Sequence, residues 1–217
     1  MPNETLRHKG LRNKLVKELA AKGITDSKVL EAMNNVPRHL FMNQSLDPVI
    51  AYMDTAMDIG RMQTISRPFT VAFQTQLLDI GKKESVLEVG TGSGYQTAVL
   101  SYMKANVYTI ERQQELFLSA KSLLHTLGYK AKCFFADGYQ GLSAFAPFDR
   151  ILVTCGAPQI PDALIQQLKV GGTMVIPIGE KQQTMYKIIK KSENSFEKLN
   201  FGDCKFVPMV EEKEIHF

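Results

Sequence analysis

Long apolar runs and paired cysteines are both missing from this chain. No apolar stretch approaches the roughly 18 residues that a membrane helix needs, so we expect no membrane partner. The three cysteines are far apart and form no C-x-x-C pair, which argues against a disulfide framework and against a bound metal. The start of the chain lacks the apolar core of a signal peptide. We therefore expect a cytoplasmic protein without a metal.

A strong excess of charge is missing as well. The formal net charge is only +4, although six lysines and arginines fall within residues 1–22. They could form an arm that binds nucleic acid. However, Leu11, Leu15 and Leu19 give the same segment an apolar side, as in an amphipathic helix with a solvated face. No aromatic residue is interleaved and no RNA-binding motif is present, so we expect no nucleic-acid partner. We also expect the protein to be a monomer.

Strand and helix patterns alternate through most of the chain, which predicts a parallel sheet with right-handed crossovers. We expect an α/β fold: a doubly wound, mostly parallel seven-stranded sheet with helices on both faces, an antiparallel C-terminal hairpin and a helical N-terminal extension. At 217 residues the chain suits one domain. Its expected parts are N-terminal helices with a substrate-covering loop (1–78), a cofactor-binding core (79–182) and C-terminal strands (183–217).

Individual elements follow from periodicity and from turn residues. Helices are expected at 4–22, 27–34, 70–78, 97 onward, 113–127 and 161–168, the last ended by Gly171 and Gly172. Strands are expected at 86–89, 107–110, 131–135, 148–154, 173–177, 184–191 and 196–207. Residues 43–70 show little periodicity and are expected to be mostly irregular. A long irregular segment in a compact domain is more often functional than idle.

A glycine-rich turn follows the strand at 86–89. Glycines at positions 90, 92 and 94 allow positive φ and a close approach of a ligand to the backbone, and the helix behind them offers free N–H groups. A dinucleotide fingerprint needs its third glycine at position 95, which is Tyr95 here. Glu88 ends the strand and the turn holds no Lys or Arg, so a cationic, hydroxyl-rich ligand such as S-adenosylmethionine fits better than a pyrophosphate.

Two further acids end the next two expected strands. Glu111 can accept hydrogen bonds from ribose hydroxyls, and Asp137, followed by Gly138, can meet the adenine amino group. With Glu88 they predict a ligand crevice at the carboxyl edge of a parallel sheet. The expected cofactor-binding residues are Glu88, Gly90, Thr91, Gly92, Ser93, Gly94, Glu111, Arg112, Asp137 and Gly138.

Five stretches of the sequence resemble the protein-L-isoaspartate O-methyltransferase family. They are residues 36–41, 63–68, 86–97, 146–151 and 206–210, so the resemblance runs over nearly the whole chain. The most specific is Thr64-Ile65-Ser66-Arg67-Pro68, because the T-I-S-x-P element is not shared across methyltransferases. Two positions depart from the family pattern: Met62 stands where glycine is usual, and Arg67 stands where glutamine or alanine is more usual.

The resemblance implies a repair enzyme that methylates the free α-carboxylate of L-isoaspartyl residues in damaged proteins and peptides and releases S-adenosylhomocysteine. Ser66 is implied as the catalytic residue, a donor that orients the acceptor, and Thr64, Ile65, Ser66 and Val210 as substrate-binding residues. A carboxylate with a pKa near 4 is already ionised at pH 7, so the reaction needs no general base. We therefore interpret His39 as structural.

Other functions stay open from the sequence. The same fold could methylate a small molecule or RNA, although no Asn/Asp-Pro-Pro-Tyr motif is present. The departures at Met62 and Arg67 also leave room for a relative that binds S-adenosylmethionine without catalysis. An NAD-dependent oxidoreductase is disfavoured by Tyr95.

Overall fold

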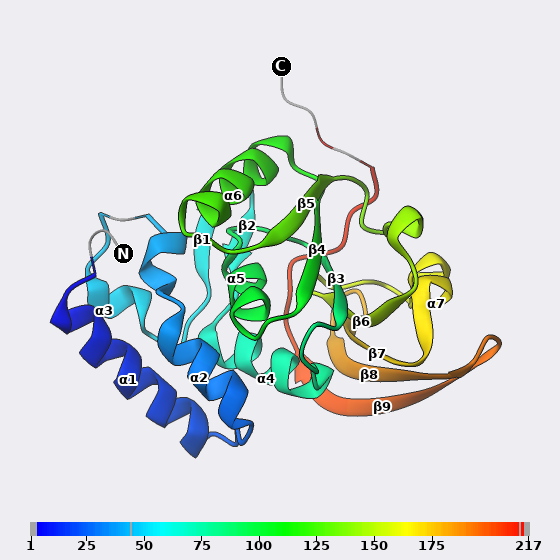
Figure 1. Cartoon of the computed structure of the whole chain (residues 1–217), viewed down its shortest axis with the longest axis horizontal. Helices are drawn as coiled ribbons and strands as arrows, with labels where there is room; N and C mark the ends of the chain where they lie inside the picture. Colours follow the sequence, from blue (N-terminus) through cyan, green and yellow to red (C-terminus); the bar gives the residue numbers. More distant parts are fainter. Residues whose placement is uncertain (1–3, 44, 213, 215–217) are drawn as a thin grey trace.

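The computed structural model describes residues 4–43, 45–212 and 214 (Figure 1). The chain begins with helices α1 (Leu6–Ala21) and α2 (Ser27–Asn35), the 3-10 helix η1 (Arg38–Phe41) and the short helix α3 (Pro48–Ala51). The side chain of Thr5 accepts the His8 amide at the start of α1, and Gly23 follows its end with φ +100°. As expected from its sequence, α1 is amphipathic, and its buried leucines join α2, α4 and α5 in one apolar cluster.

The centre of the molecule is a seven-stranded sheet with the order β5-β4-β3-β6-β7-β8-β9. Its strands are β3 (Ser85–Val89), β4 (Asn106–Glu111), β5 (Ala131–Phe135), β6 (Phe148–Val153), β7 (Leu168–Ile178), β8 (Gln183–Ser192) and β9 (Ser195–Cys204). The pairs from β5 to β7 are parallel, and β7, β8 and β9 pair antiparallel. The expected fold class is confirmed, including the C-terminal hairpin.

Helices cover both faces of this sheet. They are α4 (Pro68–Leu78), α5 (Tyr95–Tyr102), α6 (Gln114–Thr126) and α7 (Asp162–Gln167). On one face, Leu78 of α4 and Leu100 of α5 pack against Val86. On the other face, Leu164 of α7 packs against Leu87. The chain leaves β3 toward β4 and β5 and later returns to its other side with β6, so the strand order reverses between β3 and β6, where ligands of such sheets bind.

The segment 43–70 is more regular than its sequence predicts. It holds α3 and an antiparallel hairpin of β1 (Met57–Gly60) and β2 (Gln63–Ile65). Strands this short carry almost no periodic signal. Their turn also lacks the usual Asn-Gly signature, because Arg61 and Met62 take the two left-handed positions with φ 56° and 55°. In Figure 1 this hairpin lies beside α5 and α6.

The expected helix at 161–168 agrees with α7 to within one residue, but the expected role of Gly171 and Gly172 as its end was wrong. Helix α7 ends at Gln167, and Leu168 already pairs with Phe148 in the sheet. Gly171 and Gly172 lie inside β7 rather than after a helix. A Cβ at Gly172 would sit 2.7 Å from the Lys169 carbonyl oxygen, so glycine serves an irregular register of the strand.

Within the described residues, none of the helices combines the length and apolar character that a bilayer span requires.

Candidate functional site

The glycine turn after β3 is held against the neighbouring strands. The amides of Gly90 and Thr91 both donate to the Ile110 carbonyl oxygen, at 2.9 and 3.0 Å. Gly90 has φ +100°, and a Cβ there would lie 2.4 Å from Oγ1 of Thr154. Thr154 itself donates to the carbonyl oxygens of Val89 and Gly90, at 3.0 and 2.7 Å. A side chain at position 90 therefore has no room, and the backbone of the turn stays open to a ligand.

Glu111 ends β4 beside this turn. Its Oε2 accepts the Gly92 amide at 2.9 Å and its Oε1 accepts the Gln113 amide at 3.0 Å. The side chain is only 6% exposed. Each carboxylate oxygen keeps a further lone pair, so the fixed carboxylate can accept a pair of neighbouring hydroxyl groups.

The C-terminal segment lies against three of the predicted site residues: Asp137, Gly138 and Arg112. Asp137 accepts the amides of Tyr139 at 2.9 Å and Glu212 at 3.3 Å. Gly138 packs so closely that a Cβ would lie 2.5 Å from Cγ1 of Val89. Arg112 donates from Nε to the Glu212 carbonyl oxygen at 2.9 Å, and it pairs with Glu214 at 2.9 Å. Arg112 and Asp137 thereby fasten the end of the described chain across the carboxyl edge of the sheet.

Two adjoining cavities meet at the glycine turn. The first is lined by Gln63, Thr64, Ile65, Ser66, Val71, Gln74, Gly90, Thr91, Gly92, Ser93, Tyr95, Gln96, Glu111, Thr154, Cys155 and Val207. The second is lined by Gln63, Val89, Gly90, Ile110, Glu111, Arg112, Gly138, Cys155, Pro208, Met209 and Val210. Gln63, Gly90, Glu111 and Cys155 belong to both walls. The structure thus brings the T-I-S-x-P element, the glycine turn and the C-terminal segment together, although they lie far apart in sequence.

Glu88 lies near the carboxyl end of β3, as expected, but it lines neither cavity. It is fully buried below the turn, accepts a hydrogen bond from the Thr97 hydroxyl, and is absent from the walls of both cavities. Its Oε1 has no hydrogen-bond partner, and burial raises the pKa of this carboxyl group to about 8. A strand-end acid faces a ligand only if its side chain points that way, and strand alternation here turns Glu88 into the protein interior. This arrangement fits support of the turn better than direct contact with a ligand. Asp137 and Gly94 are also absent from both walls; Gly94 precedes α5 with φ +86° and packs against Leu124.

Several wall residues were not singled out from sequence. Gln74 comes from α4 and Gln96 from the first turn of α5, while Thr154 and Cys155 follow β6 directly. Their signal was position: residues just after a central parallel strand border the ligand crevice. The glutamines carried no signal, because helix periodicity shows which face is buried and not which cavity that face meets.

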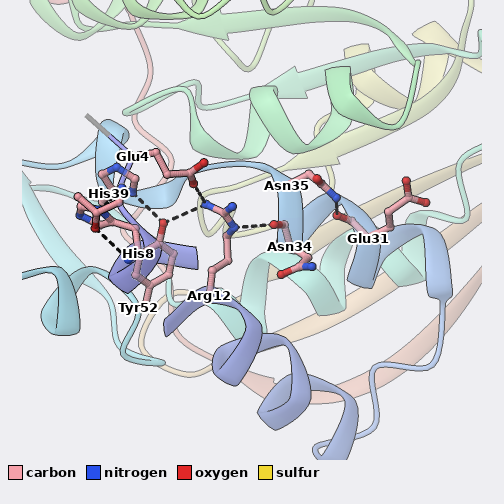
Figure 2. Close-up of polar contacts among 9 residues, drawn as sticks. Glu4, His8, Arg12, Glu31, Asn34, Asn35, His39 and Tyr52 are labelled. Carbon is pink, nitrogen blue, oxygen red and sulfur yellow. Dashed lines mark hydrogen bonds and ion pairs between the residues drawn. The ribbon is translucent and has the colours of Figure 1, made fainter. Parts of the chain in front are cut away.

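His39 lies in a separate polar cluster among the N-terminal helices (Figure 2). Its Nδ1 is 2.7 Å from the Tyr52 hydroxyl, and its ring stacks on His8 with 4.0 Å between centroids. Burial is the main cause that lowers the pKa of His39 to about 4. The hydrogen bond and the stacking of His39 fit its interpretation as a structural residue, and it lies outside the walls of both cavities.

In the part of the chain that the structure describes, no group of three His, Cys, Asp or Glu side chains is placed to hold a metal ion.

Comparison with known proteins agrees with this geometry. A family model described as protein-L-isoaspartate(D-aspartate) O-methyltransferase matches residues 10–214. A protein-L-isoaspartate O-methyltransferase of Flavobacterium psychrophilum is 57% identical over 211 residues, which cover 97% of this chain and 99% of the relative. A solved protein-L-isoaspartate O-methyltransferase superposes with a TM-score of 0.84 at 29% identity; the match covers 91% of this chain and 65% of that one. A Plasmodium falciparum structure assigned to the same enzyme, in complex with S-adenosyl-L-homocysteine, superposes with a TM-score of 0.81 at 26% identity. The match covers 92% of this chain and 98% of that one.

Proposed function

The chain belongs to the protein-L-isoaspartate(D-aspartate) O-methyltransferase family, and from this premise we propose that it repairs damaged proteins. It transfers a methyl group from S-adenosylmethionine to the free α-carboxylate of L-isoaspartyl residues. The observation that carries the proposal is the meeting of Ser66, the glycine turn and Glu111 in the wall of one cavity. This arrangement puts an acceptor-binding element next to a nucleoside-binding element.

The residues of the two cavities fit S-adenosylmethionine. A carboxylate with both oxygens fixed by backbone amides, Glu111, suits the ribose hydroxyls. Gly90 and Gly92 have no side chains of their own, and both line the first cavity, so their backbone can meet the ligand directly. The first cavity has an acidic wall residue and no Lys or Arg in its wall, which suits a cationic ligand. We propose that the predicted cofactor-binding residues in the cavity walls, Gly90, Thr91, Gly92, Ser93, Glu111, Arg112 and Gly138, contact the cofactor. Glu88, Gly94 and Asp137 lie outside both walls, and we propose that they support the turn and the segment after β5.

The proposed reaction needs no general base from the protein. S-adenosylmethionine, when bound, supplies an electrophilic methyl group on a sulfonium. The acceptor carboxylate is already ionised at neutral pH, so no residue has to remove a proton. We propose that Ser66 donates a hydrogen bond that orients this carboxylate, and that Thr64, Ile65 and Val210 bind the peptide around it. The rate gain then comes from positioning in an enclosed and poorly hydrated site.

We also propose that the protein acts as a monomer in the cytoplasm, without a nucleic-acid or membrane partner. Cys133, Cys155 and Cys204 are free thiols, as expected in a reducing compartment. Basic residues of the N-terminal region form ion pairs, Arg7 with Asp47 and Lys22 with Asp54, which fits a solvated face. Sedimentation of the purified protein at several concentrations tests the monomer.

The experiment that tests the function measures tritium transfer from labelled S-adenosylmethionine onto an isoaspartyl peptide and onto its aspartyl twin. We expect label on the isoaspartyl peptide only. Equal labelling of both peptides would contradict the substrate assignment. Label on RNA or on a small molecule, but on neither peptide, would support a methyltransferase of another class. Binding of S-adenosylhomocysteine without any transfer would indicate a relative that has lost catalysis.

A further inference from the structure

Gln96 is a buried glutamine whose amide group has a fixed direction. It sits in the first turn of α5 and is 7% exposed. Its Nε2 donates to the Thr75 hydroxyl at 2.9 Å, and that hydroxyl donates to the Val71 carbonyl oxygen at 2.7 Å. Because the single Thr75 proton is already committed to Val71, the hydroxyl can only accept from Gln96. The amide therefore presents its nitrogen to Thr75 and its oxygen to the other side.

That oxygen, Oε1 of Gln96, is buried and has no hydrogen-bond partner. Leaving a buried acceptor unsatisfied is unfavourable. The buried Gln167 avoids this: it accepts the Leu142 amide at 2.7 Å and donates to the Gln140 carbonyl oxygen at 2.8 Å. Gln113 also has an unpaired Oε1, but it lies outside the cavity walls, whereas Gln96 shares the first cavity with Ser66 and Gly92. A preset acceptor in this wall calls for a ligand that brings a donor.

The positions of the acceptors along the two cavities indicate which donor group of the cofactor can reach Gln96. Glu111 and the segment after β5 flank the second cavity, where they suit the ribose hydroxyls and the adenine amino group. The first cavity extends past the glycine turn toward Ser66, Gln74 and Gln96. The methyl group must reach the neighbourhood of Ser66, so the methionyl end of the cofactor belongs in this first cavity. Its α-ammonium carries three N–H donors, and hydrogen bonds to a charged donor are stronger than neutral ones.

We propose that Oε1 of Gln96 accepts a hydrogen bond from the α-ammonium of S-adenosylmethionine, with Thr75 as the residue that holds the amide in this direction. Gln96 thereby fixes the methionyl chain relative to Ser66 and acts as a positioning residue for the transferred methyl group. The inference rests on the proposed function, since it takes the cofactor as given. It assigns to α4 and α5 a part in cofactor recognition that is separate from Glu111.

Calorimetry tests this assignment with two ligands: S-adenosylhomocysteine and its analogue in which hydrogen replaces the α-ammonium. We expect wild-type protein to prefer the ammonium-bearing ligand by about tenfold or more, as for loss of a hydrogen bond to a charged group. Gln96→Met keeps the side-chain length but removes the acceptor, so the ratio of the two affinities should fall to within about threefold. Gln167→Met is the matched control: it loses a buried glutamine away from the cavity and should keep the wild-type ratio.

Thr75→Val provides an independent variant. It keeps the shape of Thr75 and removes the hydroxyl that orients Gln96, so the ratio should fall here too. An unchanged ratio in Gln96→Met and Thr75→Val, with intact melting temperatures, would overturn the assignment while leaving the proposed function standing. The same unchanged ratio with a raised KM for the isoaspartyl peptide would place the amide on the acceptor instead. Absence of S-adenosylhomocysteine binding by wild-type protein would overturn both proposals.

Discussion

Gly92 and Glu111 are joined by a hydrogen bond of 2.9 Å, in which the Gly92 amide donates to Oε2 of Glu111 across 19 residues of sequence. This bond ties the glycine turn after β3 to the acid at the end of β4. The same carboxylate receives the Gln113 amide on its other oxygen. The protein's own hydrogen bonds therefore hold turn and acid together, and such preorganisation lowers the ordering cost of binding.

Glu111→Ala should weaken binding of S-adenosylhomocysteine by roughly 10- to 100-fold, or about 1.5–3 kcal/mol, as for hydrogen bonds to a charged group. The variant removes the acceptor of the ribose and releases the amide of Gly92. Glu31→Ala on α2 is the control, because this acid contacts Tyr102 far from the turn. Isothermal titration measures both affinities, and an unchanged affinity in Glu111→Ala would refute the ribose assignment.

Glu88 makes stability depend on pH in the alkaline direction. Burial raises its pKa from 4.5 to about 8 in the folded protein, so the folded state retains a proton that the unfolded chain loses. Its favourable contribution is complete below pH 4.5 and is lost as pH rises toward 8. Glu88→Gln imitates the protonated carboxyl, so it should match wild-type stability near pH 4.5 and exceed it near pH 8.

Urea unfolding of wild-type protein and Glu88→Gln at a series of pH values checks this difference. Glu84→Gln is the control. Glu84 is partly exposed and pairs with Arg150, so this variant shows how the free energy of unfolding changes when an ion-paired glutamate is lost. A stability difference between wild type and Glu88→Gln that stays constant from pH 4.5 to 8 would mean that Glu88 titrates normally.

His39 acts in the opposite direction. Its pKa is lowered from 6.5 to about 4 in the folded protein, mainly by burial, with further lowering by His8 and Arg12 and an opposing effect of Glu4. Its contribution to stability is therefore complete above pH 6.5 and is lost as pH falls through 4. His39→Gln cannot take up a proton and should flatten the decline of unfolding free energy between these pH values.

The matched control for His39→Gln is His125→Gln, which removes the histidine in the last turn of α6. Thermal unfolding at pH 4.5, 5.5 and 7 distinguishes the two variants. If His125→Gln flattens the acid decline as much as His39→Gln does, the stacked and buried environment of His39 is not its source.

Met62 stores backbone strain at the tip of the β1–β2 hairpin. It has φ +55° and its side chain is 91% exposed, so no packing compensates for the left-handed conformation. Met62→Gly should raise the free energy of unfolding by about 0.5–1 kcal/mol, since relief of strain exceeds the added entropy of an unfolded glycine. Met62→Ala keeps the Cβ and should gain nothing. Denaturant unfolding compares the three proteins, and equal stability would contradict the strained turn.

The sequence predicted the sheet and its helices, because strand–helix alternation and the glycine turn leave few topologies open. It singled out only part of the walls of the two cavities, mainly the glycine turn, Glu111 and the Thr64–Ser66 segment. It did not predict the β1–β2 hairpin, whose strands are too short for a periodic signal and whose turn residues, Arg61 and Met62, have no turn preference. It also did not show that Glu88 points inward, because a strand-end position does not say which way a side chain faces. The sequence also could not single out Gln96. Its hydrogen bond to Thr75 and its unpaired Oε1 depend on how α4 and α5 pack together.

The site residues that stay predictions share one feature: their roles depend on a ligand. Thr64, Ile65 and Val210 lie in the cavity walls with Ser66. Ser66 belongs to the family's most specific motif, and its proposed partner is the reacting carboxylate.

The central claim is that Ser66 orients an acceptor that is already ionised. Its most direct test is the rate of methyl transfer from tritiated S-adenosylmethionine to an isoaspartyl peptide by wild-type protein and by Ser66→Ala, with S-adenosylhomocysteine affinity measured on both. We predict a loss of transfer of roughly 10²–10³-fold, the scale for removing one preorganised donor, with cofactor affinity changed by less than about twofold. Full transfer activity in Ser66→Ala would contradict the claim and leave Ser66 as a turn residue before Pro68.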